Sequence, residues 1–272
     1  MKSFLLLLCL LPLFATAATK TCTFTAADGT ELSTYSASGE LTWAEASGMT
    51  TGNIIISDSN RARTDTTSTS FYYTTNWSPA TYNYDIEATV NFITVPTSNN
   101  TYLGIGGRAT STSTQSGYTA WLARASGVWQ IQLARAGSAT LTTVNITTPT
   151  AGQNIALKLV MRDHYLKVSW DGTEVINYKV DTTSANFLTT AGNASLYMDG
   201  VTSFLSNTTG IHLDDFTVTD AATPQTTGTL TVSNSDLWYN GYDGTGTPKQ
   251  SAFAAWRFTT AATVLKITGI SD

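Results

Sequence analysis

The sequence has few charged residues and few cysteines. Among 272 residues only 12% are Asp, Glu, Lys or Arg, and 14 basic residues face 19 acidic ones. A soluble domain usually carries about 25% charged residues. A nucleic-acid-binding protein is expected to present a basic surface, which this composition does not supply. The composition therefore excludes a nucleic-acid partner and indicates a surface of neutral polar side chains.

The N-terminus has the features of a secretory signal peptide. Lys2 gives a positive start, residues 4–14 are apolar apart from Pro12, and Ala15-Thr16-Ala17 is a small-x-small cleavage pattern. The apolar run is too short to cross a hydrocarbon core of about 30 Å. We therefore predict cleavage after Ala17, a secreted, extracellular protein and no membrane span.

Removal of this leader takes Cys9 away and leaves Cys22 as the only cysteine. An internal disulfide is then excluded, so the fold must depend on its hydrophobic core. Cys22 alternates with Phe24 at a spacing of two residues. This spacing predicts a small buried residue on a first strand rather than a catalytic thiol.

What the chain does contain favours β-structure. Aromatic residues make up 11% of it and there are 52 threonines, both typical of strands, whereas strong helix formers are scarce. Apolar residues alternate with polar ones over 82–92 and 155–161. Asp163-His164 predicts a turn, and Asp171-Gly172 predicts a two-residue hairpin. We predict an all-β, two-sheet antiparallel sandwich.

The strand pattern divides the chain after Asp220. Residues 18–220 predict one sandwich, and residues 221–228 have the small, polar, proline-containing composition of a linker. Residues 229–272 show new strand patterns but are too few for a large core. We expect this β-rich tail either to pack on the sandwich or to begin an incomplete second domain.

Several segments resemble a concanavalin A-like, or laminin G-like, jelly-roll module. They are Phe24–Thr30, Trp43, Asn60-Arg61, Tyr84–Ala88, Gly107-Arg108, Trp121–Arg124, Leu166–Val168, Asp171–Thr173 and Gly210–Val218. The resemblance covers nearly all of 20–220. It implies two antiparallel sheets, one of them concave, and a place among secreted modules that are commonly assigned to glycan binding. The tail, around Leu237–Tyr242, is similar to the β module that precedes some SGNH-type esterase domains.

Two carboxylates are candidates for hydrolytic chemistry. Asp85 and Glu87 are two residues apart on one strand and so share a face. Glycosidases place two carboxyl groups about 5–5.5 Å apart in retaining enzymes or about 6.5–9.5 Å apart in inverting ones, a separation that such a pair could meet. Related glucanases have Glu-x-Asp-x-x-Glu at this place, whereas Asn83 stands here at the first glutamate. The alternative is that both acids decorate a solvent-facing strand.

Polar residues on the central strands are the preferred ligand-binding candidates. We expect Trp121 and Trp129 in the core, and a polar face opposite them. Donors beside an aromatic ring suit the hydroxyl groups and CH faces of neutral sugars. The predicted ligand-binding residues are Arg108, Tyr118, Arg124, Gln130 and Gln132.

Other chemistry has weaker support. Asp28, Asp214 and Asp215, with Asp220, come from the two ends of the module, whose first and last strands commonly lie together, and they could hold a structural Ca²⁺ if they converge. The alternative is ordinary turn chemistry by aspartate. The chain has two histidines and no Gly-x-Ser-x-Gly elbow, which argues against a serine triad.

Three functional hypotheses follow. The first is a secreted, non-catalytic module that binds a polysaccharide or glycan, as in adhesion. The second is a glycoside hydrolase using Asp85 and Glu87. The third is an interaction protein, or an accessory fragment of a larger SGNH-type esterase. The sequence does not indicate an oligomeric state.

Overall fold

The computed structural model describes residues 17–46, 53–65, 70–99, 101–110, 115–136, 139–199 and 206–221. Thr16–Ala221 forms one compact unit. Residues 1–16 and 222–272 lie outside the described residues, so the expected leader, linker and tail stay predictions. Within the described ranges, no helix is long and apolar enough to cross a membrane.

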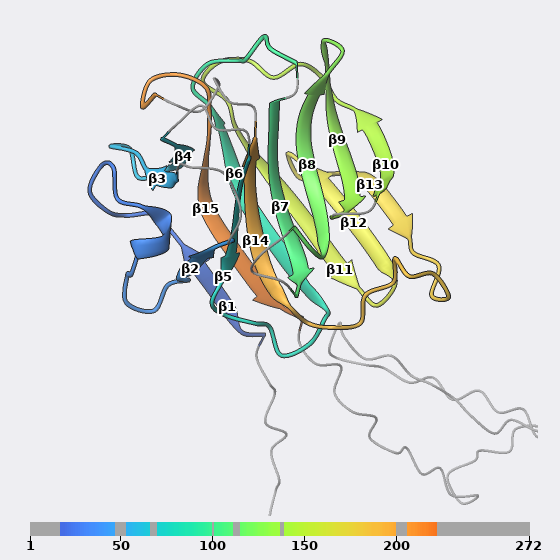
Figure 1. The fold of residues 1–272 in the computed structure, drawn as a ribbon. Coiled ribbons are helices and arrows are strands. Elements are labelled where there is room, and N and C mark those ends of the chain that lie inside the picture. Colours follow the sequence, from blue (N-terminus) through green and yellow to red (C-terminus); the bar gives the residue numbers. More distant parts are fainter. Residues whose placement is uncertain are drawn as a thin grey trace, which may run out of the picture. The chain divides into compact units, whose positions relative to one another are not determined.

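The described strands form two antiparallel sheets, which Figure 1 shows as two layers. The first sheet has eight strands, and β1 (Thr19–Cys22) joins it by pairing with β15. The others, in order across the sheet, are β13 (Thr173–Lys179), β12 (Tyr165–Trp170), β11 (Asn154–Arg162), β6 (Tyr84–Phe92), β15 (Ile211–Asp220), β4 (Ala62–Thr64) and β3 (Ile54–Ile56).

The second sheet has seven strands. Across the sheet these are β10 (Ala139–Asn145), β9 (Val128–Arg135), β8 (Tyr118–Ala125), β7 (Thr101–Ala109), β14 (Asn193–Asp199), β5 (Ser70–Thr75) and β2 (Trp43–Glu45). A short 3-10 turn, η1 (Leu32–Thr34), is the one helical element in the described part of the chain. The predicted all-β antiparallel sandwich is confirmed.

Local sequence explains the strands of the first sheet. Burial alternates along β6 and β11, because side chains of a strand point to opposite faces in turn. The turn between β12 and β13 has Asp171 at a φ of 51° and Gly172 at a φ of 74°. Two left-handed residues are what a type I′ hairpin requires, so the predicted hairpin is confirmed.

The core lies between the two sheets and is rich in aromatic rings. Phe92 packs edge-on against Trp129 and Trp170, at centroid distances of 5.7 and 6.3 Å. Cys22 is fully buried, and Trp43 Nε1 donates to its Sγ at 3.4 Å. Burial raises the pKa of the Cys22 thiol to about 11, so the thiol is protonated and inert. The predictions for Cys22 and Trp129 are confirmed.

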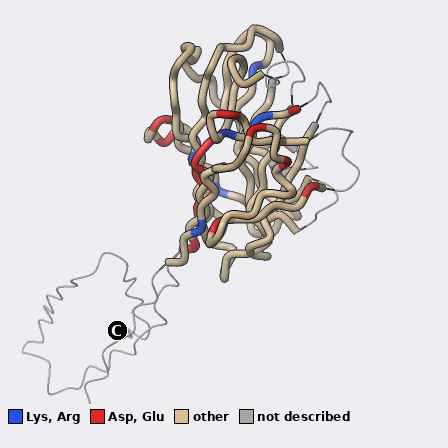
Figure 2. Tube along the Cα trace, turned by 90° about the vertical axis from the view of Figure 1, so that its left-hand side faces the viewer, with Lys and Arg blue, Asp and Glu red and all other residues tan. Residues whose placement is uncertain are grey.

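Charged residues occupy a small part of this fold. Most of the described trace in Figure 2 carries neither an acid nor a base. Where charges do occur on strands of the eight-stranded sheet, opposite signs pair, as in Lys158 with Glu87 at 3.1 Å and Lys167 with Glu174 at 2.8 Å. Opposite charges on this sheet therefore partly neutralise each other.

Candidate functional site

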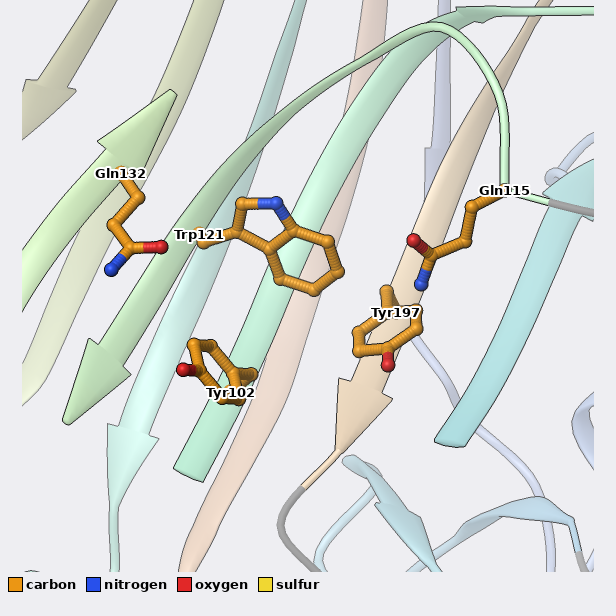
Figure 3. Close-up of a pocket in the computed structure, with 5 residues that line it drawn as sticks. All are labelled: Tyr102, Gln115, Trp121, Gln132 and Tyr197. Atoms are coloured by element: carbon orange, nitrogen blue, oxygen red, sulfur yellow. The ribbon is translucent and has the colours of Figure 1, made fainter. Parts of the chain in front are cut away.

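A shallow pocket of about 200 Å³ lies on the seven-stranded sheet. It opens on the outer face, which is the face turned away from the other sheet. Figure 3 shows side chains from different strands, together with Gln115 from the segment before β8, gathered around it. The lining residues are Tyr102, Gln115, Trp121, Gln132 and Tyr197.

Strand register places the centre of this pocket in one line. Tyr197 pairs with Gly104, Gly104 with Trp121, and Trp121 with Gln132, across β14, β7, β8 and β9. Residues in register on one face have adjacent side chains. We call these four residues the cross-strand row. Its order puts an aromatic ring on each side of a glycine and an amide at one end.

Gly104 makes room for the indole of Trp121. A methyl group at position 104 would lie 2.7 Å from Trp121 Cε3 and 2.8 Å from Thr119 Cγ2, closer than carbon atoms approach. The indole can therefore lie over the backbone of β7 only because residue 104 has no side chain. Leu103 and Ile105 on either side of it point inward and are fully buried.

Two tyrosines hold the indole on edge. The rings of Trp121 and Tyr197 are 4.3 Å apart at 87°, and those of Trp121 and Tyr102 are 6.2 Å apart at 80°. Edge-to-face contacts of this kind are favourable and fix the orientation of a ring. Tyr197 is 8% exposed, whereas Trp121 and Tyr102 are half-buried and reach the pocket.

Amide groups form the polar side of the pocket. Gln132 Nε2 donates to Gln130 Oε1 at 3.1 Å, and Gln130 Nε2 donates to Asn145 Oδ1 at 3.2 Å. An amide has two N–H donors and one acceptor oxygen, so Gln132 has bonding capacity beyond this one contact. Of the predicted ligand-binding residues, Gln132 lines the pocket and Gln130 adjoins it.

Arg124 lies apart from these amides. It pairs in register with the buried Trp129, at the end of β8. Its Nη1 donates to the carbonyl of Thr97 and to Asn99 Oδ1, the latter at 3.1 Å. The predicted grouping of Arg124 with Gln130 and Gln132 on one face is therefore wrong.

Arg108 was expected on the ligand face, and that placement is wrong. Its side chain is fully buried, and Nε, Nη1 and Nη2 donate to the carbonyls of Tyr82, Leu188 and Asp163 at 2.8, 2.6 and 2.9 Å. The guanidinium also stacks over the rings of Tyr82 and Tyr118. Burial lowers the pKa of Arg108, and these bonds compensate for its lost hydration. Arg108 joins three connecting segments.

Tyr118 is likewise a core residue rather than a ligand-facing one. Its ring is fully buried, its hydroxyl donates to the carbonyl of Asn186 at 2.5 Å, and it accepts from the N–H of Leu188 at 3.0 Å. Burial raises the pKa of Tyr118. The expectation that Trp121 belongs to the core is wrong as well. Strand β8 turns Tyr118, Ala120 and Leu122 inward, so Trp121, which alternates with them, points outward.

Asp85 and Glu87 lie on the eight-stranded sheet, away from the pocket. Lys158 Nζ is 3.8 Å from Asp85 Oδ2 and 3.1 Å from Glu87 Oε2, and Arg162 Nη1 is 2.6 Å from Asp85 Oδ1. Both carboxylates are thus held by basic side chains of the neighbouring β11. Neither residue lines the pocket.

The aspartates considered for calcium do not form a cluster. β1 and β15 do pair, as expected. However, Asp28 is held by Arg63 at 3.7 Å and by Asn207 at 3.1 Å, while Asp214 lies 3.9 Å from Arg61 and accepts the N–H of Asp215. In the described ranges no three acidic, histidine or cysteine residues converge as metal ligands would. A calcium site remains an untested prediction.

Sequence reasoning missed Tyr102, Gln115 and Tyr197. A signal existed for the first: in β7 the buried Leu103 and Ile105 alternate with Tyr102 and Gly104 at period two. This alternation puts Tyr102 on the same outer face as a glycine. Nothing in the local sequence places Tyr197 beside it, because β14 follows β7 by about 90 residues.

No family model matches this sequence, and no curated protein matches it. One similar solved structure carries the description "Prominent members of the human gut microbiota express endo-acting O-glycanases to initiate mucin breakdown". It is 9% identical to this chain, has a TM-score of 0.51, and matches over 74% of this chain and 98% of that one. Winged bean acidic lectin, complexed with methyl-α-D-galactose, is 9% identical over 75% and 98%, with a TM-score of 0.49.

The carbohydrate-binding module CBM66 from Bacillus subtilis is 13% identical over 65% of this chain and 91% of that one, with a TM-score of 0.43. Identities this low bear on the fold alone. The two-sheet antiparallel sandwich has the same fold as the first of these structures, in agreement with the jelly-roll fold that the resemblance in the sequence implies.

Proposed function

We propose that this protein is a secreted, non-catalytic module that binds a glycan on the outer face of its seven-stranded sheet. The observation that carries the proposal is the cross-strand row, which exposes an oriented indole beside an amide. The leader-like N-terminus supports secretion. Non-catalytic binding is favoured because the described lining side chains are aromatic rings and amides, with no carboxylate or histidine among them.

The chemistry of the row suits a sugar ring. A pyranose has an apolar face of CH groups and a rim of hydroxyl groups. The indole of Trp121 offers an apolar surface for the first, and the amides of Gln132 and Gln115 offer donors and acceptors for the second. A few polar groups converging on an apolar floor are typical of ligand sites.

The test is affinity electrophoresis through gels that contain soluble polysaccharides. We expect retardation by at least one of them, and at least a tenfold loss of affinity in Trp121→Ala. Tyr165→Ala is the matched control, because Tyr165 is an aromatic residue on the other sheet with 41% exposure. Both variants are first checked for native circular dichroism. Unchanged retardation of folded Trp121→Ala would remove the site from the proposal.

A further inference from the structure

The pocket on the seven-stranded sheet is uncharged. None of its five lining residues is Asp, Glu, Lys, Arg or His. Six further side chains on the outer face of the same sheet are neutral as well. They are Tyr72, Thr74, Thr119, Ala123, Gln130 and Ser195.

This lack of charge selects the ligand. A uronic acid or a sulfated sugar loses hydration on entering a pocket, and it needs an arginine or lysine to compensate. A sugar held through Ca²⁺ needs carboxylate oxygens at the ion. The lining residues supply neither group, so their chemistry fits a neutral sugar that is bound by direct contacts.

The angles between the aromatic rings determine whether the ligand can be a flat crystalline surface or a single soluble chain. A crystalline polysaccharide exposes a flat surface of sugar rings, and binding to it calls for aromatic rings that lie in one plane. The rings of Tyr197 and Tyr102 stand at 87° and 80° to that of Trp121. Such rings make a notch around the indole instead of a flat strip.

The size of the pocket limits what it can enclose. Its volume is about 200 Å³, whereas pockets that enclose drug-sized ligands measure about 300–1,000 Å³. One sugar ring fits this space better than an oligosaccharide does. The rest of a longer chain would then lie over the sheet or in solvent.

We infer that the pocket holds one uncharged pyranose residue of a soluble glycan chain, bound without a bridging metal ion; this inference rests on the proposed glycan-binding function. Tyr197, Tyr102 and the glycine at position 104 fix the indole on which that residue stacks. Gln132 and Gln115 contact its hydroxyl groups.

The experiment compares polymers that share a backbone and differ in charge or packing. Hydroxyethylcellulose is paired with carboxymethylcellulose, and dextran with dextran sulfate, in affinity gels run with and without EDTA. Neutral galactomannan and xyloglucan extend the panel, and microcrystalline cellulose is tested by sedimentation. We expect at least one neutral soluble polymer to retard the protein equally with and without EDTA, and Trp121→Ala to lose at least tenfold in affinity.

The other outcomes separate the two claims. Retardation by acidic polymers alone, loss of retardation in EDTA, or sedimentation with microcrystalline cellulose would overturn the inference and leave glycan binding intact. Retardation by no polymer in the panel would overturn both the inference and the proposed function.

Discussion

The outer faces of the two sheets are built from the same strand alternation but carry different chemistry. On the eight-stranded sheet, the outward positions include acids and bases that pair across strands, such as Asp85 with Arg162 at 2.6 Å. On the seven-stranded sheet, the residues that line the pocket are aromatic rings and amides. The first face pairs many of its charged groups with one another. The second leaves an indole and amides available to a ligand.

This difference also explains the low charge of the chain. Paired ions at a surface contribute little to stability, typically about 0–1 kcal/mol each, but they keep a sheet face soluble. A partly exposed aromatic cluster that lines a pocket has no such benefit, and we take it as an interaction site. The aromatic pocket therefore needs a functional explanation, and the paired charges of the other sheet do not.

The largest expected effect on stability is that of Arg108→Met, which tests whether the buried Arg108 has a structural role rather than a ligand-binding one. The substitution leaves three buried carbonyls unpaired, and each such group costs about 1–3 kcal/mol. We expect the free energy of unfolding in urea to fall by about 3 kcal/mol or more, with glycan affinity of the folded protein unchanged. Arg162→Met, on the charged face, is the control. Lost affinity at unchanged stability would return Arg108 to the ligand site.

The next effect concerns Gly104 and Gly106, two glycines of β7 on the outer face of the seven-stranded sheet. Gly104→Ala forces the indole of Trp121 to move, since the added methyl group lies 2.7 Å from its Cε3. We expect about tenfold weaker glycan binding, or about 1.4 kcal/mol. Gly106→Ala is the contrast, because its methyl group meets Ser195 Oγ at 2.5 Å and the carbonyl of Tyr118 at 2.8 Å. It should lower the melting temperature more than the affinity. Equal losses of affinity would show that the indole has no special role.

A pH-dependent effect is expected on the eight-stranded sheet. His212 is fully buried beside Arg61 and Arg63, and burial lowers its pKa from 6.5 to about 4. The unfolded chain therefore binds a proton that the folded one does not. Stability is fully present above pH 6.5 and falls as the pH drops toward 4, by at most about 1.4 kcal/mol per pH unit.

Denaturant titrations between pH 7 and pH 4 measure this slope. His212→Gln should flatten it, and His164→Gln, in the turn after β11, should retain it. Glycan affinity should not depend on His212, because this residue lies on the other sheet. An identical slope in His212→Gln and in the unsubstituted protein would show that other groups control acid sensitivity.

The smallest effect is expected from Lys158→Met on the charged face. This substitution removes the cation between Asp85 and Glu87, which are 3.8 and 3.1 Å from its Nζ. Exposed pairs of this kind contribute about 0.5 kcal/mol or less, and salt weakens them further. Unfolding in low and high salt measures the change. A loss of glycan binding in this variant would place the ligand on the eight-stranded sheet and would contradict our account.

The strands of the sandwich follow from the sequence because alternation is a local signal. Residues 84–92 and 154–162 alternate in burial as their composition predicts. The faces of β8 do not follow so simply, since both carry apolar residues: Trp121 and Ala123 on one, Ala120 and Leu122 on the other. Hydrophobicity alone favours burying the tryptophan, and the prediction was wrong.

The turn between β8 and β9 contains the information that hydrophobicity lacks. Ser126 and Gly127 both have positive φ, at 48° and 82°, as a two-residue hairpin requires. This turn sets Leu122 opposite the buried Ile131 and Trp121 opposite Gln132. Register from the turn therefore identifies Trp121 as outward. Burial of Arg108 has no such local signal, because its three carbonyl partners come from segments far apart in the chain.

The most direct test of the central claim follows the indole N–H signals of the ¹⁵N-labelled protein by NMR. The ligand is an oligosaccharide of the polysaccharide that retards the protein most, and Trp121→Phe identifies the signal of Trp121. Our account predicts that this signal shifts on titration while those of the core residues Trp43 and Trp129 stay in place. A stationary Trp121 signal under saturating ligand, or shifts confined to Trp170 on the eight-stranded sheet, would contradict it.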